Sequence, residues 1–221
     1  MQKRKRHTGW IAALCIAVVI AATAGVYCRF GGFGTGGCAD TEEFSKYAVN
    51  VSALTVPDEA QIIALGEATH GNSRILISGH NNHIMRCQNA GTLVLGSLLA
   101  KELGSGYYAI GTDFYKSVCN LPKPYTGERI THTFYSHDPL AKASKKCGLE
   151  VGFLDFSKVP EGSALTEYLS NNIPIGSLGE SYSVLMNFVP RSYRVQRTPQ
   201  DTYDAMIFVA NATPIEIKPE K

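Results

Sequence analysis

The chain has 221 residues, of which 44% are hydrophobic and 18% are charged, and its formal net charge at pH 7 is +2. This composition fits one globular domain with one additional apolar segment, and it excludes a disordered or fibrous protein. The positive charge is concentrated in residues 3–7, so the remainder is close to neutral. The chain has no basic stripe with interleaved aromatic residues, and we therefore expect no nucleic acid partner.

The first 28 residues have the layout of a membrane signal-anchor. Residues 1–8 are basic, and residues 9–28 contain no charged residue. An apolar helix of about 20 residues crosses about 30 Å of hydrocarbon. Because the basic cluster comes first, we expect residues 1–8 in the cytoplasm and the rest of the chain outside the cell membrane, anchored by a single pass. Secretion after signal cleavage, with 22–24 as the cleavage site, is the alternative.

The glycine-dense residues 29–39 predict a linker, which leaves residues 40–221 for the domain. The alternation of short apolar runs with helical patterns predicts a layered α/β fold with a mostly parallel or mixed sheet. In chain order we expect a helix at 42–49, buried strands at 61–65 and 75–77, a helix at 93–103, strands at 107–111 and 130–135, a helix at 139–146, a strand at 151–156, a helix at 163–170 and a strand at 203–209.

The strand expected at 61–65 is followed directly by Gly-Glu-Ala-Thr-His-Gly, residues 66–71. Glu67 lies three residues before His70 and can orient the imidazole and stabilise its charge. A histidine held in this way can deprotonate water near neutral pH. An isolated Glu-x-x-His is more often a capped loop with a solvated acid.

The strand expected at 75–77 is followed by Gly-His-Asn-Asn-His, residues 79–83. His80 and His83 share one face if this segment is helical, and the two amides between them could donate to an oxyanion. Taken alone, this pattern is more often a polar turn. Since ligands of open α/β sheets bind at the carboxyl ends of strands, the two groups together predict a catalytic site.

That site would consist of Glu67, His70, His80 and His83. The same four residues would also be a ligand set for zinc or iron, although their spacing matches no zinc motif. We rank a metal below metal-free base catalysis and expect no cofactor. A serine nucleophile ranks lower still, because the chain has no Gly-x-Ser-x-Gly elbow. His132 and His137 are expected to be structural.

Several blocks of the sequence resemble the erythromycin esterase family. Residues 63–71, Ile-Ala-Leu-Gly-Glu-Ala-Thr-His-Gly, are similar to its hallmark motif, and residues 80–84 resemble its second histidine motif. The later blocks 107–114, 153–156 and 203–209, with Thr213-Pro214 after the last, resemble family segments in the same order, so that the resemblance extends from about residue 48 to residue 214.

The resemblance implies an α/β fold and the hydrolysis of macrolide lactone esters by water activated on a histidine. It implies that His70 is the general base, Glu67 its partner, and His80 and His83 the groups that bind or polarise the carbonyl. We therefore expect a hydrolase acting on a small-molecule ester or lactone, with a role in the response to an antibiotic.

The resemblance also implies that this chain is internally shortened. Family members are longer, and a largely helical region with a further essential acid separates their two histidine motifs. Here only residues 66–74 lie between the two expected strands. A parallel pair usually needs a crossover of about a dozen residues, whereas a hairpin would leave His80 about 14 Å from the His70 loop at about 3.4 Å per residue. A catalytically inactive, surface-anchored binding or relic domain is therefore the alternative.

The charge asymmetry generates a test of topology. Protease added to intact cells is expected to remove residues 40–221 and to spare residues 1–8, because the domain would lie on the outer face of the membrane. Immunoblotting with antibodies against each segment measures this, and a cytoplasmic protein serves as the control for cell integrity. A domain that survives the treatment would contradict the expected topology.

Overall fold

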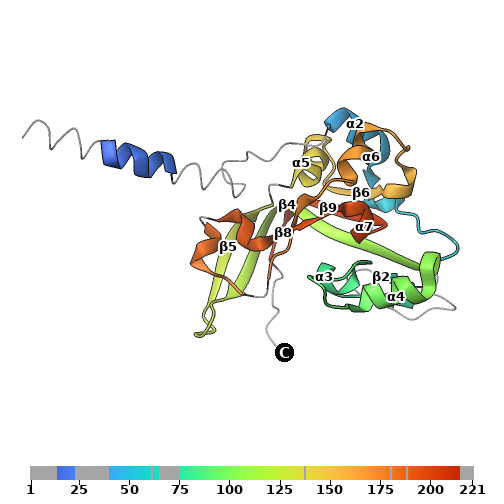
Figure 1. Cartoon of the computed structure of the whole chain (residues 1–221), viewed down its shortest axis with the longest axis horizontal. Helices are drawn as coiled ribbons and strands as arrows, with labels where there is room; N and C mark the ends of the chain where they lie inside the picture. Colours follow the sequence, from blue (N-terminus) through green and yellow to red (C-terminus); the bar gives the residue numbers. More distant parts are fainter. Residues whose placement is uncertain are drawn as a thin grey trace, which may run out of the picture.

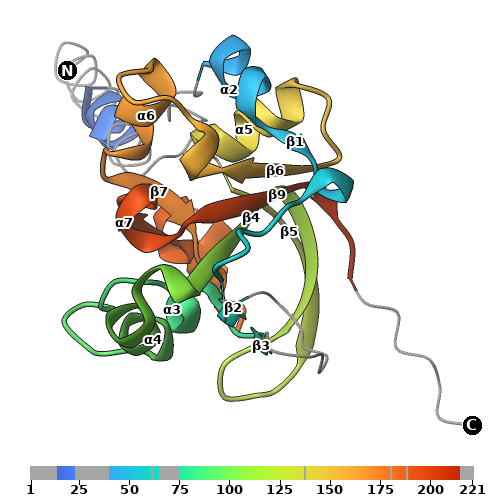
Figure 2. The same cartoon turned by 90° about the vertical axis from the view of Figure 1, so that its right-hand side faces the viewer.

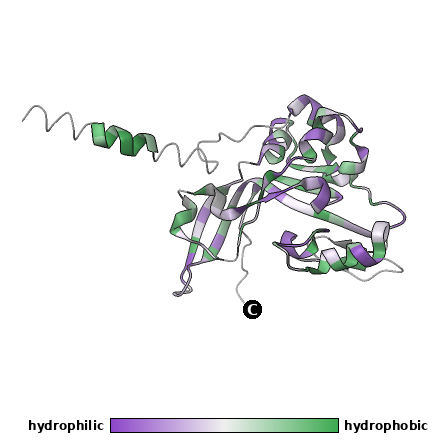
Figure 3. Cartoon of the chain, viewed as in Figure 1, coloured by the Kyte–Doolittle hydropathy of each residue, from purple (hydrophilic) through white to green (hydrophobic). Residues whose placement is uncertain are grey.

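The structure is a computed structural model that describes residues 14–22, 40–60, 62–64, 75–136, 138–179, 181–187 and 189–214. Residues 14–22 form an apolar helix (Figure 3). Residues 9–13 and 23–28 of the expected membrane span and the expected linker lie outside the described residues. None of the helices described is long and apolar enough to cross a membrane. The signal-anchor stays a prediction.

One mixed sheet of seven strands forms the centre of the domain, in the spatial order β1-β6-β9-β4-β2-β3, with β5 paired to β4 (Figures 1 and 2). Strands β3, β2, β4 and β9 are parallel to one another, whereas β6 is antiparallel to β9, β1 to β6, and β5 to β4. The expected α/β class with a mixed sheet is confirmed. The strands are β1 (Val49–Asn50), β2 (Ile62–Ala64), β3 (Ile75–Ile77), β4 (Tyr107–Pro122), β5 (Arg129–Tyr135), β6 (Val151–Asp155) and β9 (Ala205–Ala212).

Helices cover the sheet, and a separate two-stranded sheet lies beside it. The strands β7 (Ile173–Gly176) and β8 (Arg194–Arg197) form this small antiparallel sheet. The helices are α2 (Thr41–Tyr47), α3 (Asn81–Ile84), α4 (Leu95–Leu103), α5 (Pro139–Lys146), α6 (Ala164–Leu169) and α7 (Pro199–Thr202). The helices expected near 42–49, 93–103, 139–146 and 163–170 are confirmed with shifts of no more than two residues at their ends.

The main core lies between the sheet and these helices. Phe44 of α2 and Leu140 of α5 pack with Phe208 of β9, and all three side chains are almost fully buried. The rings of Phe44 and Phe208 meet edge to face at 5.8 Å. Helix α5 begins where the sequence predicts because Asp138 caps it and Pro139, which has no N–H to leave unpaired, occupies its first turn.

Strand β4 is much longer than the five residues expected. Its first part pairs with β2, its middle with β9 and its last part with β5. The apolar run ends at Gly111, and polar and apolar residues alternate beyond it along the β4–β5 hairpin (Figure 3). The continuous apolar signal therefore reports only the buried part of the strand.

The two short strands β2 and β3 pair in parallel, with Ile62 opposite Ile75 and Ala64 opposite Ile77. The hairpin alternative is wrong. Ten residues, 65–74, join the strands. They suffice because a crossover must return along one strand, and a strand of three residues is only about 7 Å long at about 3.3 Å per residue. Burial was expected for both strands, but β3 is at the sheet edge and Ile75 is exposed.

The parallel register decides where the histidine motifs leave the sheet. Ala64, the last residue of β2, lies opposite Ile77 of β3 and Ala109 of β4. The chain after β2 and the chain after β3 therefore emerge at the same edge, on the side toward which β4 continues to Thr112 and Asp113. This is the edge at which parallel α/β sheets bind ligands.

A substitution at Gly96 of α4 tests the close contact between α4 and the end of α3. A Cβ at this position would lie 2.2 Å from the backbone oxygen of Ile84, at the end of α3. Alanine favours a helix by about 1 kcal/mol over glycine, so only the steric clash can destabilise the Gly96→Ala variant, by about 1–3 kcal/mol.

Urea denaturation measures this free energy of unfolding. Gly179→Ala is the matched control, because a Cβ there meets nothing within 4 Å, and we expect it to remain within about 0.5 kcal/mol of the wild type. A Gly96→Ala variant as stable as that control would show that α4 moves freely relative to α3.

Candidate active site

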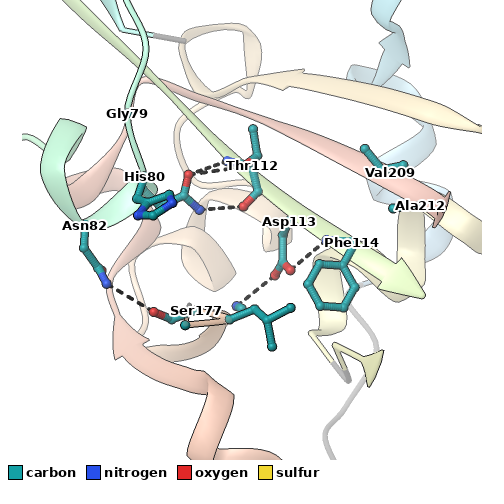
Figure 4. A pocket seen from close by; sticks show the side chains of 13 residues that line it. Gly79, His80, Asn82, Thr112, Asp113, Phe114, Ser177, Val209 and Ala212 are labelled. Carbon is teal, nitrogen blue, oxygen red and sulfur yellow. Dashed lines mark hydrogen bonds between the residues drawn. The ribbon is translucent and has the colours of Figure 1, made fainter. Parts of the chain in front are cut away.

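A pocket of about 390 Å³ opens at the edge of the sheet where β3 ends, beside the middle of β4 (Figure 4). One wall is the turn from β3 into α3, residues 79–82. The opposite wall is residues 176–179, at the end of β7. Residues 112–114 of β4 lie between the two walls, and Val209 and Ala212 of β9 complete the lining.

His80 and His83 are the sequence-predicted site residues that fall within the structure. His80, the residue before α3, lines the pocket. Its backbone carbonyl accepts the backbone N–H of His83 at 2.8 Å. The two imidazole rings are roughly parallel, with centroids 6.1 Å apart. Both side chains are exposed. A ligand in the pocket can therefore reach His80 directly. His83 lies three residues later, within α3.

Asn81 ties α3 to β4. Strand β2 accompanies β4 only as far as Ala109, so Thr112 faces α3 on that side, while its other side pairs with Ile207 of β9. The Asn81 Nδ2 donates to the Thr112 carbonyl at 2.6 Å, and the Thr112 N–H and hydroxyl donate to the Asn81 Oδ1 at 3.1 and 3.2 Å (Figure 4). The Asn81 side-chain amide thus makes the two backbone hydrogen bonds that a neighbouring strand would make with Thr112. The Asn81 Nδ2 uses one of its two hydrogens in this contact, and the expectation that it could donate to an oxyanion stays a prediction.

Asn82 ties the two walls of the pocket together. Its Nδ2 donates to the Ser177 hydroxyl at 3.1 Å (Figure 4). Ser177 is itself held by its backbone N–H, which donates to the Tyr193 carbonyl at 2.8 Å. An amide nitrogen carries two hydrogens, and the bond to Ser177 uses one of them. Asn82 thus also keeps a hydrogen that suits an oxyanion.

Asp113 is a pocket residue that the sequence analysis missed. Its side chain is only 4% exposed. The carboxylate accepts the backbone N–H of Phe114 at 2.7 Å, that of Gly176 at 3.0 Å, and the Ser136 hydroxyl at 3.1 and 3.2 Å. A Cβ on Gly176 would lie 2.3 Å from Asp113 Oδ1, so glycine is required for this approach. An acid two residues after the apolar run of β4, which ends at Gly111, was the available signal.

A second carboxyl group, Asp138, lies behind Asp113. Its Oδ1 caps α5 by accepting the N–H groups of Leu140 and Ala141 at 2.6 and 3.3 Å, whereas its Oδ2 is buried and receives no N–H or hydroxyl donor from the described residues. Complete burial raises the pKa of Asp138 well above its usual value, and the charge and hydrogen bonding of Asp113 raise it further. Both effects favour the protonated form of the Asp138 carboxyl group.

Arg194 of β8 supplies the positive charge of this buried cluster. Its Nη2 donates to the Pro174 carbonyl at 2.9 Å, while its Nε is buried without a partner. Burial lowers the pKa of Arg194, and the negative charges of Asp138 and Asp113 oppose that effect. One guanidinium thus faces two carboxyl groups, and a single proton on the carboxyl pair makes the cluster neutral.

The family model described as erythromycin esterase matches residues 60–212. This chain belongs to the erythromycin esterase family. The matched segment contains the pocket walls, β4 and both histidine motifs. No curated protein matches the chain.

Three solved structures resemble this erythromycin esterase family member. A succinoglycan biosynthesis protein has 18% identity and a TM-score of 0.53, covering 66% of this chain and 35% of its own. A Bacillus cereus protein has 20% identity and a TM-score of 0.53, covering 65% and 35%. A mutant of the erythromycin esterase EreC in its open conformation has 16% identity and a TM-score of 0.41, covering 64% and 33%. The chain spans about a third of the length of these proteins.

Glu67, His70 and His137 lie outside the described residues, so the role of each stays a prediction. Glu67 follows the end of β2 by three residues. His132 of β5 is described, and its ring packs against Phe134 at 4.7 Å and Tyr182 at 5.1 Å. These contacts fit the structural role expected for His132.

The buried carboxyl pair predicts how stability depends on pH. A carboxyl group whose pKa is raised on folding binds its proton more tightly in the folded state, so the stability it contributes is lost as pH rises toward the folded pKa. Asp138→Asn keeps the α5 cap and removes this titration. The stability of the variant relative to the wild type is therefore expected to increase with pH.

Urea denaturation of both proteins between pH 5 and pH 8, a range above the usual aspartate pKa of about 4, measures the difference. A constant difference in the free energy of unfolding across that range would mean that Asp138 is ionised in the folded protein.

Proposed function

We propose that this chain hydrolyses an ester or lactone with water, using His70 as the general base and Glu67 as the group that orients it. His80 and His83 bind the substrate carbonyl and stabilise the oxyanion that forms on it. The observation that carries the proposal is the parallel register of β2 and β3. Because the strands are parallel, the chain segments bearing both histidine motifs leave the sheet at one edge.

The pocket beside that edge has suitable size and chemistry. Its volume of about 390 Å³ is within the range of small-molecule sites, about 300–1,000 Å³. Its wall presents an imidazole at His80, an amide at Asn82 and a hydroxyl at Ser177, all of which can donate hydrogen bonds. Donors fixed before the reaction stabilise the charge that develops on a carbonyl oxygen during attack by water.

A catalytically inactive binding or relic domain is the second candidate. It is motivated by the short segment between the two histidine motifs, where only residues 65–74 join β2 and β3. This candidate predicts ligand binding in the pocket without hydrolysis. A metal-dependent hydrolase using the same four histidine and glutamate residues is the third.

The cellular setting is proposed from the sequence alone. Residues 9–28 would hold the domain at the outer face of the cell membrane, or would be removed on secretion. A role in the response to an antibiotic follows from family analogy, which is a weak guide to substrate.

An esterase assay decides between the first two candidates. We expect His70→Ala to lower kcat/KM by about 10²–10⁴-fold, the usual contribution of a general base, and Glu67→Gln to lower it less. His132→Ala is the matched control, because its ring contacts Phe134 and Tyr182 and is outside the pocket. Equal turnover by the wild type and both site variants would refute the assignment.

A chelator distinguishes base catalysis from metal catalysis in the same assay. The proposed mechanism has no step at a metal, so incubation with a chelator should leave kcat/KM unchanged. Elemental analysis of protein prepared without an affinity tag provides the second measurement. Stoichiometric zinc or iron that is lost in His83→Ala would favour the metal-dependent hydrolase.

A further inference from the structure

Asp113 is the carboxyl group that lines the pocket within the described part of the chain. Ester hydrolysis requires an acid as well as a base, because an alkoxide is a poor leaving group until its oxygen is protonated. The acid must reach the pocket and carry a proton near neutral pH. Asp113 meets the first condition, and its buried neighbour Asp138 supplies the second.

The hydrogen bonds around Ser136 show where a proton is needed. The backbone N–H of Asp138 donates to the Ser136 oxygen at 3.3 Å, which leaves the Ser136 hydroxyl hydrogen for Asp113. Within the described residues, no N–H or hydroxyl group donates to Asp138 Oδ2, which is fully buried. Two carboxylate oxygens can form a hydrogen bond only if one carries a proton.

The charges that face this pair favour one proton. Arg194 on β8 interacts with both carboxyl groups and balances one negative charge. Tyr193 and Tyr168 face Arg194, and Tyr203 faces Asp113; all three phenols are neutral near pH 7. A second uncompensated carboxylate in this buried cluster would be costly. One shared proton removes that cost.

We propose that Asp113 and Asp138 hold one proton between them and that Asp113 delivers it to the leaving oxygen of the ester. The inference rests on the proposed hydrolysis. The general base takes one proton from water as its oxygen forms a bond to the carbonyl carbon. The carbon–oxygen bond to the alcohol then breaks, its electron pair stays on the alcohol oxygen, and that oxygen receives the proton of the pair.

The pair recovers its proton from the protonated histidine through water, so that ester and water give alcohol and acid. While the proton is absent, two carboxylates face one guanidinium in a buried site, and the repulsion between the two negative charges favours return of the proton to Asp138. A carboxylic acid with its pKa raised by burial and by a second carboxylate is the usual form of a catalytic acid that works near neutral pH.

The Asp138→Asn variant removes the dissociable proton and is expected to leave the structure unchanged. Asparagine can still cap α5 and can still donate a hydrogen bond to Asp113, but it cannot dissociate. We expect kcat/KM for an ester with an alkyl alcohol to fall by about 10²-fold. For a nitrophenyl ester, whose leaving group needs no proton, the change should remain within about threefold.

Asp155→Asn is the matched control. Asp155 is also buried, at 6% exposure, and caps a short helical turn by accepting the Ser157 N–H at 2.9 Å, but it does not line the pocket. Its substitution should affect both esters alike. An equal loss on both esters in Asp138→Asn would overturn the proposal, because it would indicate a purely structural role.

Infrared spectroscopy tests the shared proton without any substrate. The wild type and Asp155→Asn should show the carbonyl band of a protonated carboxyl group at neutral pH, and Asp138→Asn should lack it. Absence of the band in the wild type would overturn the proposal. If the wild type cleaves neither ester, the proposed function and the acid role both fail, and the band alone decides whether the two groups share a proton.

Discussion

The buried carboxylate of Asp113 is the constraint on which the pocket depends. An ionised carboxylate is very costly to bury unless donors surround it. The backbone N–H groups of Phe114 and Gly176 and the Ser136 hydroxyl supply those donors. Gly176 begins one wall of the pocket, so satisfying this charge also sets the distance from β4 to that wall. Any side chain at Gly176 would displace the carboxylate.

The other wall is fixed by the residue next to Asp113. Thr112 lies beyond the last pair between β2 and β4, and the Asn81 side chain bonds to its N–H and carbonyl as a neighbouring strand would. Asn82, the next residue, reaches across to Ser177. Two consecutive residues of one strand thus hold both walls. The site occurs where β4 exchanges one neighbouring strand, β2, for another, β5, and there the backbone groups of Thr112 bond to a side chain.

Membership of the erythromycin esterase family agrees with the sheet and with the order of the motifs. The spacing of the two histidine motifs raised doubt, since a long crossover normally separates parallel strands. The strands here are only three residues long, and this removes the difficulty. Shortness also has a cost, because β3 remains at the edge of the sheet with Ile75 exposed.

The sequence by itself determined the fold class, the helix from Pro139 to Lys146, the strands near 62–64, 75–77 and 151–155, and the position of both histidine motifs directly after strands. These features are encoded locally, by apolar periodicity, caps and turn residues. The parallel register of β2 and β3, the full length of β4 and the small β7–β8 sheet depended on tertiary structure, because pairing partners far apart in the chain decide them. The cluster of Asp113, Asp138 and Arg194 is the clearest case. Its members come from three distant segments and match no motif, and only the tertiary structure buries them together.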